Sequence, residues 1–486
     1  MFTGAPFNYS IDILTSSPMA HTKYLNILSD EIDAFRSTAR DRVVSPTVTP
    51  ETIREHLTEH FDFSHTRALD AVIADVAEMM RRWSLHTTNP NYFGLFNPNV
   101  TEASIAADAL AALYNQQLAT WSHAPCANEI EKFTLDFFLR KFGYAPETSA
   151  AHFTSGGAEA NHTAVITALT RHFPSYGNGG VRSLPGQPVL YVSEQAHHSF
   201  FKIAHSTGIG RDAVRTVPVD RALKMDIRSL EHLIAADIRN GCVPFFVAGT
   251  VGTTPAGVVD PLEDIARVCK KNKLWFHADG AWGGAAVLSE AGAALVPGIE
   301  LADSITCDAH KWLSVSMSAG MFFCRHQHAV GEAFRITASY MPDQVRNTSD
   351  NYASSLQWSR RFIGLKVFMT LAERGADGLA AMVDDEIALG DHLRSLLSGS
   401  GWKIINNTPL PVVCFTHTRL QGGTIPVEAL INKIYDDGAV WISGVTLPHY
   451  GFVLRACIIN YTTTWDDAAR LVRTLDQFLD ETTARS

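Results

Sequence analysis

At 486 residues the chain is longer than one hydrophobic core usually supports, so we expect two or three domains. Hydrophobic residues make up 46% and charged residues 19%, which is ordinary for a folded globular protein and excludes an intrinsically disordered chain. The formal net charge of −10 argues against a surface that binds nucleic acid or an anionic membrane.

The cysteines and the N-terminus indicate the cellular compartment. Seven cysteines are scattered and never form a CxxC pair, a spacing that suits neither a disulfide framework nor a zinc site. We therefore expect no metal centre and a reducing, cytoplasmic location. The first residues lack the basic region of a signal peptide, since Asp12 precedes any apolar run. No stretch approaches the roughly 18 uninterrupted apolar residues of a membrane span.

The first 142 residues show helical patterns. Thr49 followed by Pro50 is an N-cap residue with proline at the first helical position. Apolar residues at helical spacing and end signals predict the other helices at 21–43, 67–86, 101–118 and 128–142.

From about residue 150 short apolar runs alternate with helical segments. The runs lie at 189–193, 214–219, 243–250, 274–279, 304–307 and 320–324, with a strand-like start at 153, and helices are predicted at 226–239 and 260–271. Continuous apolar strands separated by helices predict an α/β fold whose mostly parallel sheet is covered on both faces. After residue 378, runs at 412–415 and 452–458 between helices indicate a smaller α+β domain. We divide the chain at 1–90, 91–378 and 379–486.

Two charged residues stand in largely apolar segments. Lys311 lies between His310 and Trp312, and apolar surroundings would push a lysine toward the neutral amine that condenses with an aldehyde. Asp279 closes an apolar run, and a buried carboxylate needs a partner such as a protonated pyridine nitrogen. The alternatives are a surface lysine in a loop and a structural salt bridge in the core.

Other small or polar residues also follow predicted strands. They are Gly157 and Ala158 in a turn before a helix, whose N–H groups would face an anion, the histidines His197 and His198, and the threonines Thr253 and Thr254. Each signal is weak by itself, because glycine turns are common and most histidines are satisfied core or surface residues. Their order along the chain is more informative. Each follows a strand, so we expect all of them at the carboxyl edge of one sheet.

The chain resembles the group II pyridoxal-phosphate amino-acid decarboxylases, which include aromatic-L-amino-acid, glutamate and histidine decarboxylases. The resemblance extends from about residue 89 to the C-terminus, and its most specific element is the tetrapeptide HKWL at 310–313. It implies fold type I, with a large domain around a mostly parallel seven-stranded sheet, a small C-terminal α+β domain and an N-terminal helical segment. It also implies pyridoxal 5'-phosphate (PLP) as cofactor and decarboxylation of an L-amino acid to the amine and CO2.

The resemblance assigns roles to individual residues of this chain. Lys311 matches the lysine that carries the cofactor as a Schiff base, and Asp279 matches the aspartate that binds the pyridinium. The other matches are His197 stacked on the ring, Ala281 on its other face, Thr254 near the cofactor, Gly157 and Ala158 in the phosphate turn, His310 beside the lysine, Tyr92 and Phe93 in the substrate segment, and Arg455 in the C-terminal domain.

A mobile loop in this family supplies a tyrosine that returns a proton to the α-carbon. The polar segment 339–358 resembles that loop. Tyr352 is the natural match, although it stands one residue closer to Arg360 than the family pattern, and Tyr340 is the second candidate.

The chain also departs from the family pattern. Asp308 stands where many members have asparagine, and we leave it out of the phosphate site because a carboxylate repels phosphate. Asn91 stands where members with acidic substrates often carry a basic residue, which weakens a glutamate-like assignment. Four aromatic residues favour an apolar or aromatic substrate, or else line a subunit interface: Tyr92, Phe93, Phe96 and Trp121.

Three other functions remain open. A PLP-dependent aldehyde synthase shares the fold and consumes oxygen but typically lacks the loop tyrosine. An aminotransferase shares the lysine and the aspartate but has little use for the HKWL and SEQAH segments. A non-catalytic cofactor-binding or scaffold protein is the third alternative, and the lysine, the aspartate and the histidine together argue against it. In this family the active site lies at the interface of a homodimer wrapped by the N-terminal helices, so we expect a homodimer with shared active sites. The expected partner is a small amino-acid substrate, not a nucleic acid or a membrane.

Overall fold

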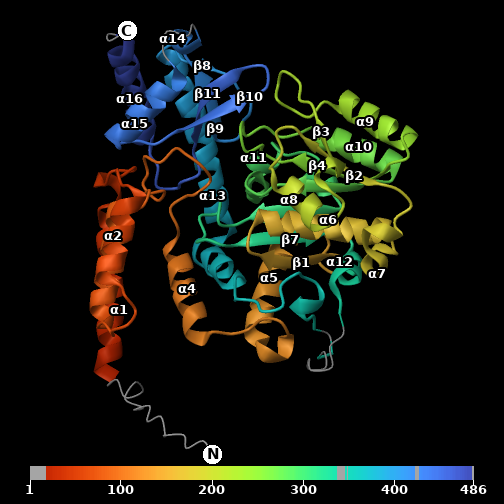
Figure 1. Ribbon diagram of the computed structural model, residues 1–486, viewed down its shortest axis with the longest axis horizontal. Helices are drawn as coiled ribbons and strands as arrows, with labels where there is room; N and C mark the ends of the chain where they lie inside the picture. Colours follow the sequence, from red (N-terminus) through yellow and green to blue (C-terminus); the bar gives the residue numbers. More distant parts are fainter. Residues whose placement is uncertain (1–17, 337–344, 347, 422–425, 484–486) are drawn as a thin grey trace, which may run out of the picture.

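The computed structural model describes residues 18–336, 345–346, 348–421 and 426–483. Among the described residues, five α-helices precede the first strand: Pro18–Ser37 (α1), Pro50–His60 (α2), Leu69–Trp83 (α3), Glu102–Tyr114 (α4) and Pro125–Lys141 (α5). Helices α1 and α2 form a column along one side of the molecule (Figure 1). The Thr49 side chain accepts the N–H of Thr52 at the start of α2, so the predicted cap is confirmed.

Seven strands form the central sheet in the order β1-β7-β6-β5-β4-β2-β3. Their bounds are Ala150–Thr154 (β1), Pro188–Ser193 (β2), Val214–Val217 (β3), Val243–Thr250 (β4), Trp275–Asp279 (β5), Ser304–Asp308 (β6) and Gly320–Cys324 (β7). Strand β7 runs antiparallel to β1 and β6, whereas the pairs from β6 across to β3 are parallel. The prediction of a mostly parallel sheet is confirmed.

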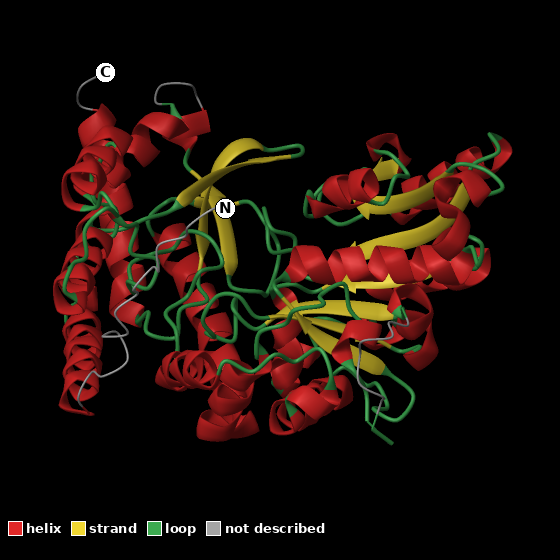
Figure 2. Ribbon diagram, turned by 60° about the horizontal axis from the view of Figure 1, so that its bottom comes forward, coloured by secondary structure: helices red, strands yellow, loops and turns green. Residues whose placement is uncertain are grey.

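Helices cover both faces of this sheet (Figure 2). The helices that follow these strands are Gly157–His172 (α6), Tyr176–Gly179 (α7), Ser199–Ser206 (α8), Ile227–Arg239 (α9), Leu262–Asn272 (α10), Glu290–Ala293 (α11) and Gln327–Phe334 (α12). On β2, Val189 and Tyr191 pack into the cluster under α9 and α10, whereas Leu190 and Val192 pack into the cluster under α6, α8 and α12. The strands are continuous apolar runs because neither face meets water.

A second, antiparallel sheet lies in the C-terminal part, in the order β10-β11-β9-β8. Its strands are Lys403–Ile404 (β8), Val412–Thr416 (β9), Ser443–Leu447 (β10) and Gly451–Cys457 (β11), with helices Gly364–Gly399 (α13), Thr418–Gln421 (α14), Val427–Asp437 (α15) and Trp465–Thr483 (α16). Helix α13 crosses the predicted boundary at residue 378, and Gly375, with φ of 69°, breaks its path. The division at residues 90 and 378 therefore stays a proposal.

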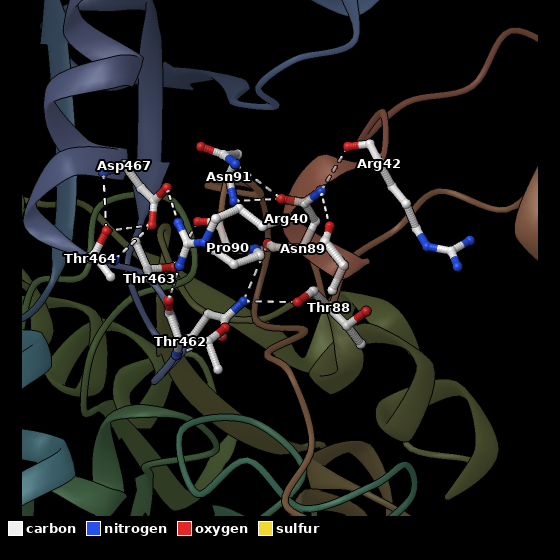
Figure 3. Close-up of polar contacts among 12 residues, drawn as sticks. Arg40, Arg42, Thr88, Asn89, Pro90, Asn91, Thr462, Thr463, Thr464 and Asp467 are labelled. Carbon is white, nitrogen blue, oxygen red and sulfur yellow. Dashed lines mark hydrogen bonds and ion pairs between the residues drawn. The ribbon is translucent and has the colours of Figure 1, made fainter. Parts of the chain in front are cut away.

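Polar contacts attach the N-terminal segment to the C-terminal part (Figure 3). The Asn460 amide donates to the carbonyl oxygens of Thr88 and Asn89, each at 3.3 Å. Arg40 pairs with Asp467 at the start of α16. These contacts fix the chain that leads from the helical column to the central sheet. Within the described residues, no helix has the length and apolar character needed to span a membrane.

Candidate active site

One cavity of about 310 Å³ opens at the carboxyl edge of the central sheet. Eight residues proposed from the sequence line it together: Gly157, Ala158, His197, Thr254, Asp279, Ala281, His310 and Lys311. They come from the segments after β1, β2, β4, β5 and β6. Parallel register brings these strand ends to one edge, as the order of the motifs predicted.

Asp279 is the last residue of β5 and only 3% of its surface is exposed. One carboxylate oxygen accepts the Asn161 amide N–H at 2.9 Å, and the other accepts the backbone N–H of Ala281 at 3.2 Å. Both donors are neutral, and no Lys, Arg or His of the described residues forms an ion pair with Asp279. A buried carboxylate held only by neutral donors suits a cation that enters the cavity.

Lys311 follows β6 by three residues, and its Nζ lies 3.1 Å from an Asp308 carboxylate oxygen. The expectation of apolar surroundings was therefore wrong, because an ion pair holds the amine. Asp308 does not turn away from the cavity but lines it, and its second carboxylate oxygen is buried without a hydrogen-bond partner. The Lys311 amine nevertheless faces the same space as Asp279 and His197.

The turn at Gly156 and Gly157, where α6 begins, leaves little room for a side chain. A Cβ at Gly157 would lie 2.9 Å from an Asp308 carboxylate oxygen and 3.0 Å from the Ala281 Cβ. His310 stands beside this turn, and its Nδ1 accepts the backbone N–H of Ala319 at 3.0 Å. When neutral, the ring then carries its proton on Nε2, which can donate to an anion at the start of α6. Burial lowers the pKa of His310, while Asp308 opposes that shift.

His197 lies on the exposed side of the cavity. Its Nδ1 accepts the backbone N–H of Ser199 at 3.2 Å, which fixes the orientation of the ring. Desolvation by the surrounding protein lowers the pKa of His197, against the opposing pull of Asp279. A neutral, oriented imidazole is suited to lie flat on an aromatic ring.

Three residues proposed from the sequence lie away from the cavity lining. Tyr92 stacks on Trp441 with ring centroids 5.0 Å apart, and Phe93 is fully buried in the apolar cluster of the small sheet. Phe93 thus has no free surface for a substrate. Tyr352 lies in the turn Asn351–Ala353, where its backbone N–H donates to Ala119. Tyr340, the second candidate for the loop tyrosine, lies outside the described residues.

Arg455, the C-terminal-domain match, is buried and donates to the Gly94 carbonyl oxygen at 2.8 Å. Its guanidinium lies 5.0 Å from the centre of the Phe96 ring, and Phe96 stacks on Trp282 in the cavity wall. Arg455 therefore supports that wall from behind.

The sequence reasoning missed Asn161, which contacts Asp279 directly. Asn161 could have been found from its position four residues after Gly157 on α6, because residues four apart lie on the same face of a helix. A helix that presents its N-terminus to the cavity also turns that face toward the end of β5.

The lining residues fit pyridoxal phosphate. The amine of Lys311 can form an imine with its aldehyde, Asp279 offers a carboxylate to its ring nitrogen, and the start of α6 with His310 offers N–H donors to its phosphate. Besides Asp279, two carboxylates line the cavity, Asp308 and Glu159, and the charge of each opposes a phosphate.

Comparison with known proteins agrees with this fit. The model of the pyridoxal-dependent decarboxylase conserved domain matches residues 50–418. An aromatic-L-amino-acid decarboxylase from Bacillus atrophaeus is 27% identical over 405 residues, which cover 82% of each chain. A 4-hydroxyphenylacetaldehyde synthase from Rhodiola rosea is 25% identical over 456 residues, which cover 90% of each chain.

A solved structure shows the same fold. The crystal structure of Oryza sativa TDC with PLP and tryptamine superposes with a TM-score of 0.90 at 22% identity, over 96% of this chain and 99% of that chain. Fold and site together define a PLP enzyme of fold type I. The chain belongs to the pyridoxal-dependent decarboxylase family, and it is a PLP-dependent carboxy-lyase that acts on amino acids.

Proposed function

We propose that the protein converts an L-amino acid with an apolar or aromatic side chain to the corresponding amine and CO2. The single observation that carries this proposal is the cavity in which Lys311, Asp279 and His197 meet. Relatives whose names include aromatic amino acids support the choice of side chain.

In this proposal each lining residue has one task. Bound PLP supplies an aldehyde that joins the substrate amine and a ring that accepts the electrons of the broken bond. Lys311 holds the cofactor until the substrate amine replaces it, while Asp279 keeps a proton on the ring nitrogen. His197 and Ala281 hold the ring plane between them, which directs the carboxylate of the substrate perpendicular to it. Thr254, Gly157, Ala158 and His310 hold the cofactor in place.

Tyr352 is the proposed donor of the proton that replaces CO2 on the α-carbon. It lies outside the cavity of its own chain, so it acts after a movement of the loop or at the cavity of a neighbouring subunit. The end of the loop already reaches the cavity, since the Gln357 amide donates to the Glu159 carboxylate at 2.9 Å. From either position the phenol of Tyr352 can act as a general acid and donate its proton to the α-carbon.

We also propose a homodimer. Large apolar side chains are exposed on three N-terminal helices: Leu25 and Leu28 on α1, Val76 and Met80 on α3, and Leu113 and Tyr114 on α4. Such a surface supports association with a second subunit. The seven free cysteines support a cytoplasmic compartment.

The experiment that tests the proposal is an assay of the purified enzyme, loaded with PLP, against a panel of L-amino acids. Release of CO2 and the matching amine should be fastest with tryptophan, tyrosine, phenylalanine or leucine, and slowest with aspartate and glutamate. Faster turnover of the acidic substrates would overturn the substrate class. Formation of aldehyde and hydrogen peroxide in place of amine would favour the aldehyde synthase, the alternative suggested by the Rhodiola relative. Sedimentation velocity tests the dimer, and an active monomer would contradict it.

A further inference from the structure

Asp279 stands at the end of a chain of buried hydrogen bonds that runs under the cavity. The chain joins β5, β6 and α6, and all of its members are buried: Trp275, His277, Ser304, Thr306, Asn161 and Asp279. Of these side chains only Asn161 and Asp279 line the cavity.

Trp275, at the end of the chain farthest from Asp279, sets the direction in which the hydrogen bonds run. The Trp275 indole can only donate, and its Nε1 donates to the Ser304 hydroxyl at 2.8 Å. That hydroxyl lies 2.8 Å from the Nδ1 of His277, so it can donate a hydrogen bond to the imidazole. Burial lowers the pKa of His277 to about 4, and the ring is therefore neutral with a single proton. When Nδ1 accepts from Ser304, that proton lies on Nε2.

The next step fixes the orientation of the Asn161 amide. Its oxygen lies 3.0 Å from the His277 Nε2 and accepts the Thr306 hydroxyl at 2.7 Å. Two donors on the oxygen leave the amide nitrogen facing Asp279, at 2.9 Å from the carboxylate. The opposite orientation would set the amide oxygen against a carboxylate oxygen, which is possible only if Asp279 is protonated.

We propose that Asn161 is a positioning residue whose amide, oriented by His277 and Thr306, holds Asp279 as an ionised acceptor for the ring nitrogen of the cofactor. The inference rests on the proposed role of Asp279 and adds the group that maintains it. Protonation of the Asp279 oxygen that faces Asn161 would require the Asn161 amide to turn over and His277 to move its proton from Nε2 to Nδ1. The chain therefore opposes protonation of Asp279 even when no cation faces it.

The test measures binding rather than turnover. Apo-enzyme is titrated with PLP and with 1-deazapyridoxal 5'-phosphate, in which carbon replaces the ring nitrogen, and the dissociation constants are compared. A charge-assisted hydrogen bond is worth roughly tenfold or more in binding, so Asn161→Leu should raise the dissociation constant for PLP by about that factor. The same variant should change binding of the deaza analogue by less than about threefold, because the ring then has no nitrogen for Asp279 to meet.

Two further variants keep the test sharp. Ser304→Ala breaks the chain at a distance and should weaken PLP binding in the same selective way, by a smaller factor. Thr163→Ala, on the same helix with its hydroxyl bonded to the Glu159 carbonyl oxygen, should affect neither ligand. Equal weakening of both ligands by Asn161→Leu would overturn the inference, since Asn161 would then only shape the cavity. Unchanged PLP binding in Ser304→Ala would overturn it even if Asn161→Leu fails to fold.

The variant Asp279→Asn distinguishes a failure of this inference from a failure of the proposed role of Asp279. If that variant weakens PLP and the deaza analogue equally, Asp279 does not meet the ring nitrogen, and both the proposed role and the inference fail. If Asp279→Asn is selective for PLP and Asn161→Leu is not, only the inference fails.

Discussion

Two buried histidines on the central sheet have opposite surroundings. His277 on β5 is fully buried under the cavity and bonds to Ser304 and Asn161. His152 on β1, at one edge of the sheet, is 1% exposed, and neither of its ring nitrogens has a hydrogen-bond partner in the part of the chain that the structure describes. Burial lowers the pKa of both, to about 4 for His277 and about 3 for His152.

The difference shows how the centre and the end of the sheet are used. At the centre, the buried side chains from Trp275 to Asn161 are hydrogen-bonded in sequence, and this chain ends at Asp279 in the cavity. At the β1 end a polar ring is enclosed without compensation, which costs stability and positions nothing. Changes at the centre should therefore alter chemistry, whereas changes at the β1 end should alter only stability.

The largest effect is expected at Lys311. Lys311→Ala removes the amine that holds the cofactor, and turnover should fall by at least about 10³-fold with little loss of folded protein. The absorbance of bound cofactor and the rate of amine release measure this. Lys270→Ala, an exposed lysine on α10, serves as the control and should keep both. Wild-type turnover by the Lys311 variant would contradict the whole assignment.

Asp279→Asn should lower turnover by roughly 10²-fold or more while PLP still binds, but weakly. The neutral amide cannot stabilise a proton on the ring nitrogen, so the electrons of the broken bond lose their acceptor. Steady-state rates at saturating PLP test this. Retained activity would mean that the ring nitrogen has another partner.

Tyr352→Phe should change the product more than the rate. Without the phenol, protonation of the α-carbon is slower, so O2 has time to react there instead. The overall reaction then converts amino acid, O2 and water to aldehyde, CO2, ammonia and H2O2. Amine and peroxide are measured together. Amine formed at the parental rate without peroxide would exclude Tyr352, and Tyr340→Phe would then be tested in the same way.

Mixed dimers show which cavity Tyr352 serves. Lys311→Ala and Tyr352→Phe subunits are combined in one dimer, which leaves one subunit with the lysine and the other with the tyrosine. Recovery of amine formation is expected if the tyrosine acts across the interface, whereas aldehyde alone is expected if it acts within its own chain.

The smallest effect is expected at the β1 end. The unfolded chain protonates His152 below pH 6.5 and the folded chain does not until about pH 3, so stability is lost as the pH falls between these values. His152→Phe should remove this loss and gain about 2 kcal/mol of unfolding free energy at pH 5 relative to its effect at pH 8. Urea denaturation at the two pH values measures it, with the exposed His232→Gln as control. Turnover should stay unchanged, and a loss of activity would contradict the comparison between the two regions.

The positions of residues at strand ends could be predicted from the sequence. An apolar run marks each strand, and the carboxyl ends of parallel strands lie at the same edge of the sheet. Asp279 and Lys311 are of this kind. Phe93 could not be placed, because an aromatic residue in a loop fits a substrate pocket or a core equally well. The Phe93 backbone bonds to Trp441 and Cys457, which lie more than 300 residues further along the chain, and these contacts place Phe93 in the core. Asn161 was missed because its contacts come from β5 and β6, which lie more than 100 residues further along the chain.

The central claim is that Lys311 binds the cofactor covalently, and one measurement tests it most directly. The enzyme loaded with PLP is reduced with borohydride, digested and mapped by mass spectrometry. We expect the phosphopyridoxyl group on the peptide that contains Lys311, and on no other lysine peptide. A label on a different lysine, or no label on a protein that still decarboxylates amino acids, would contradict the account.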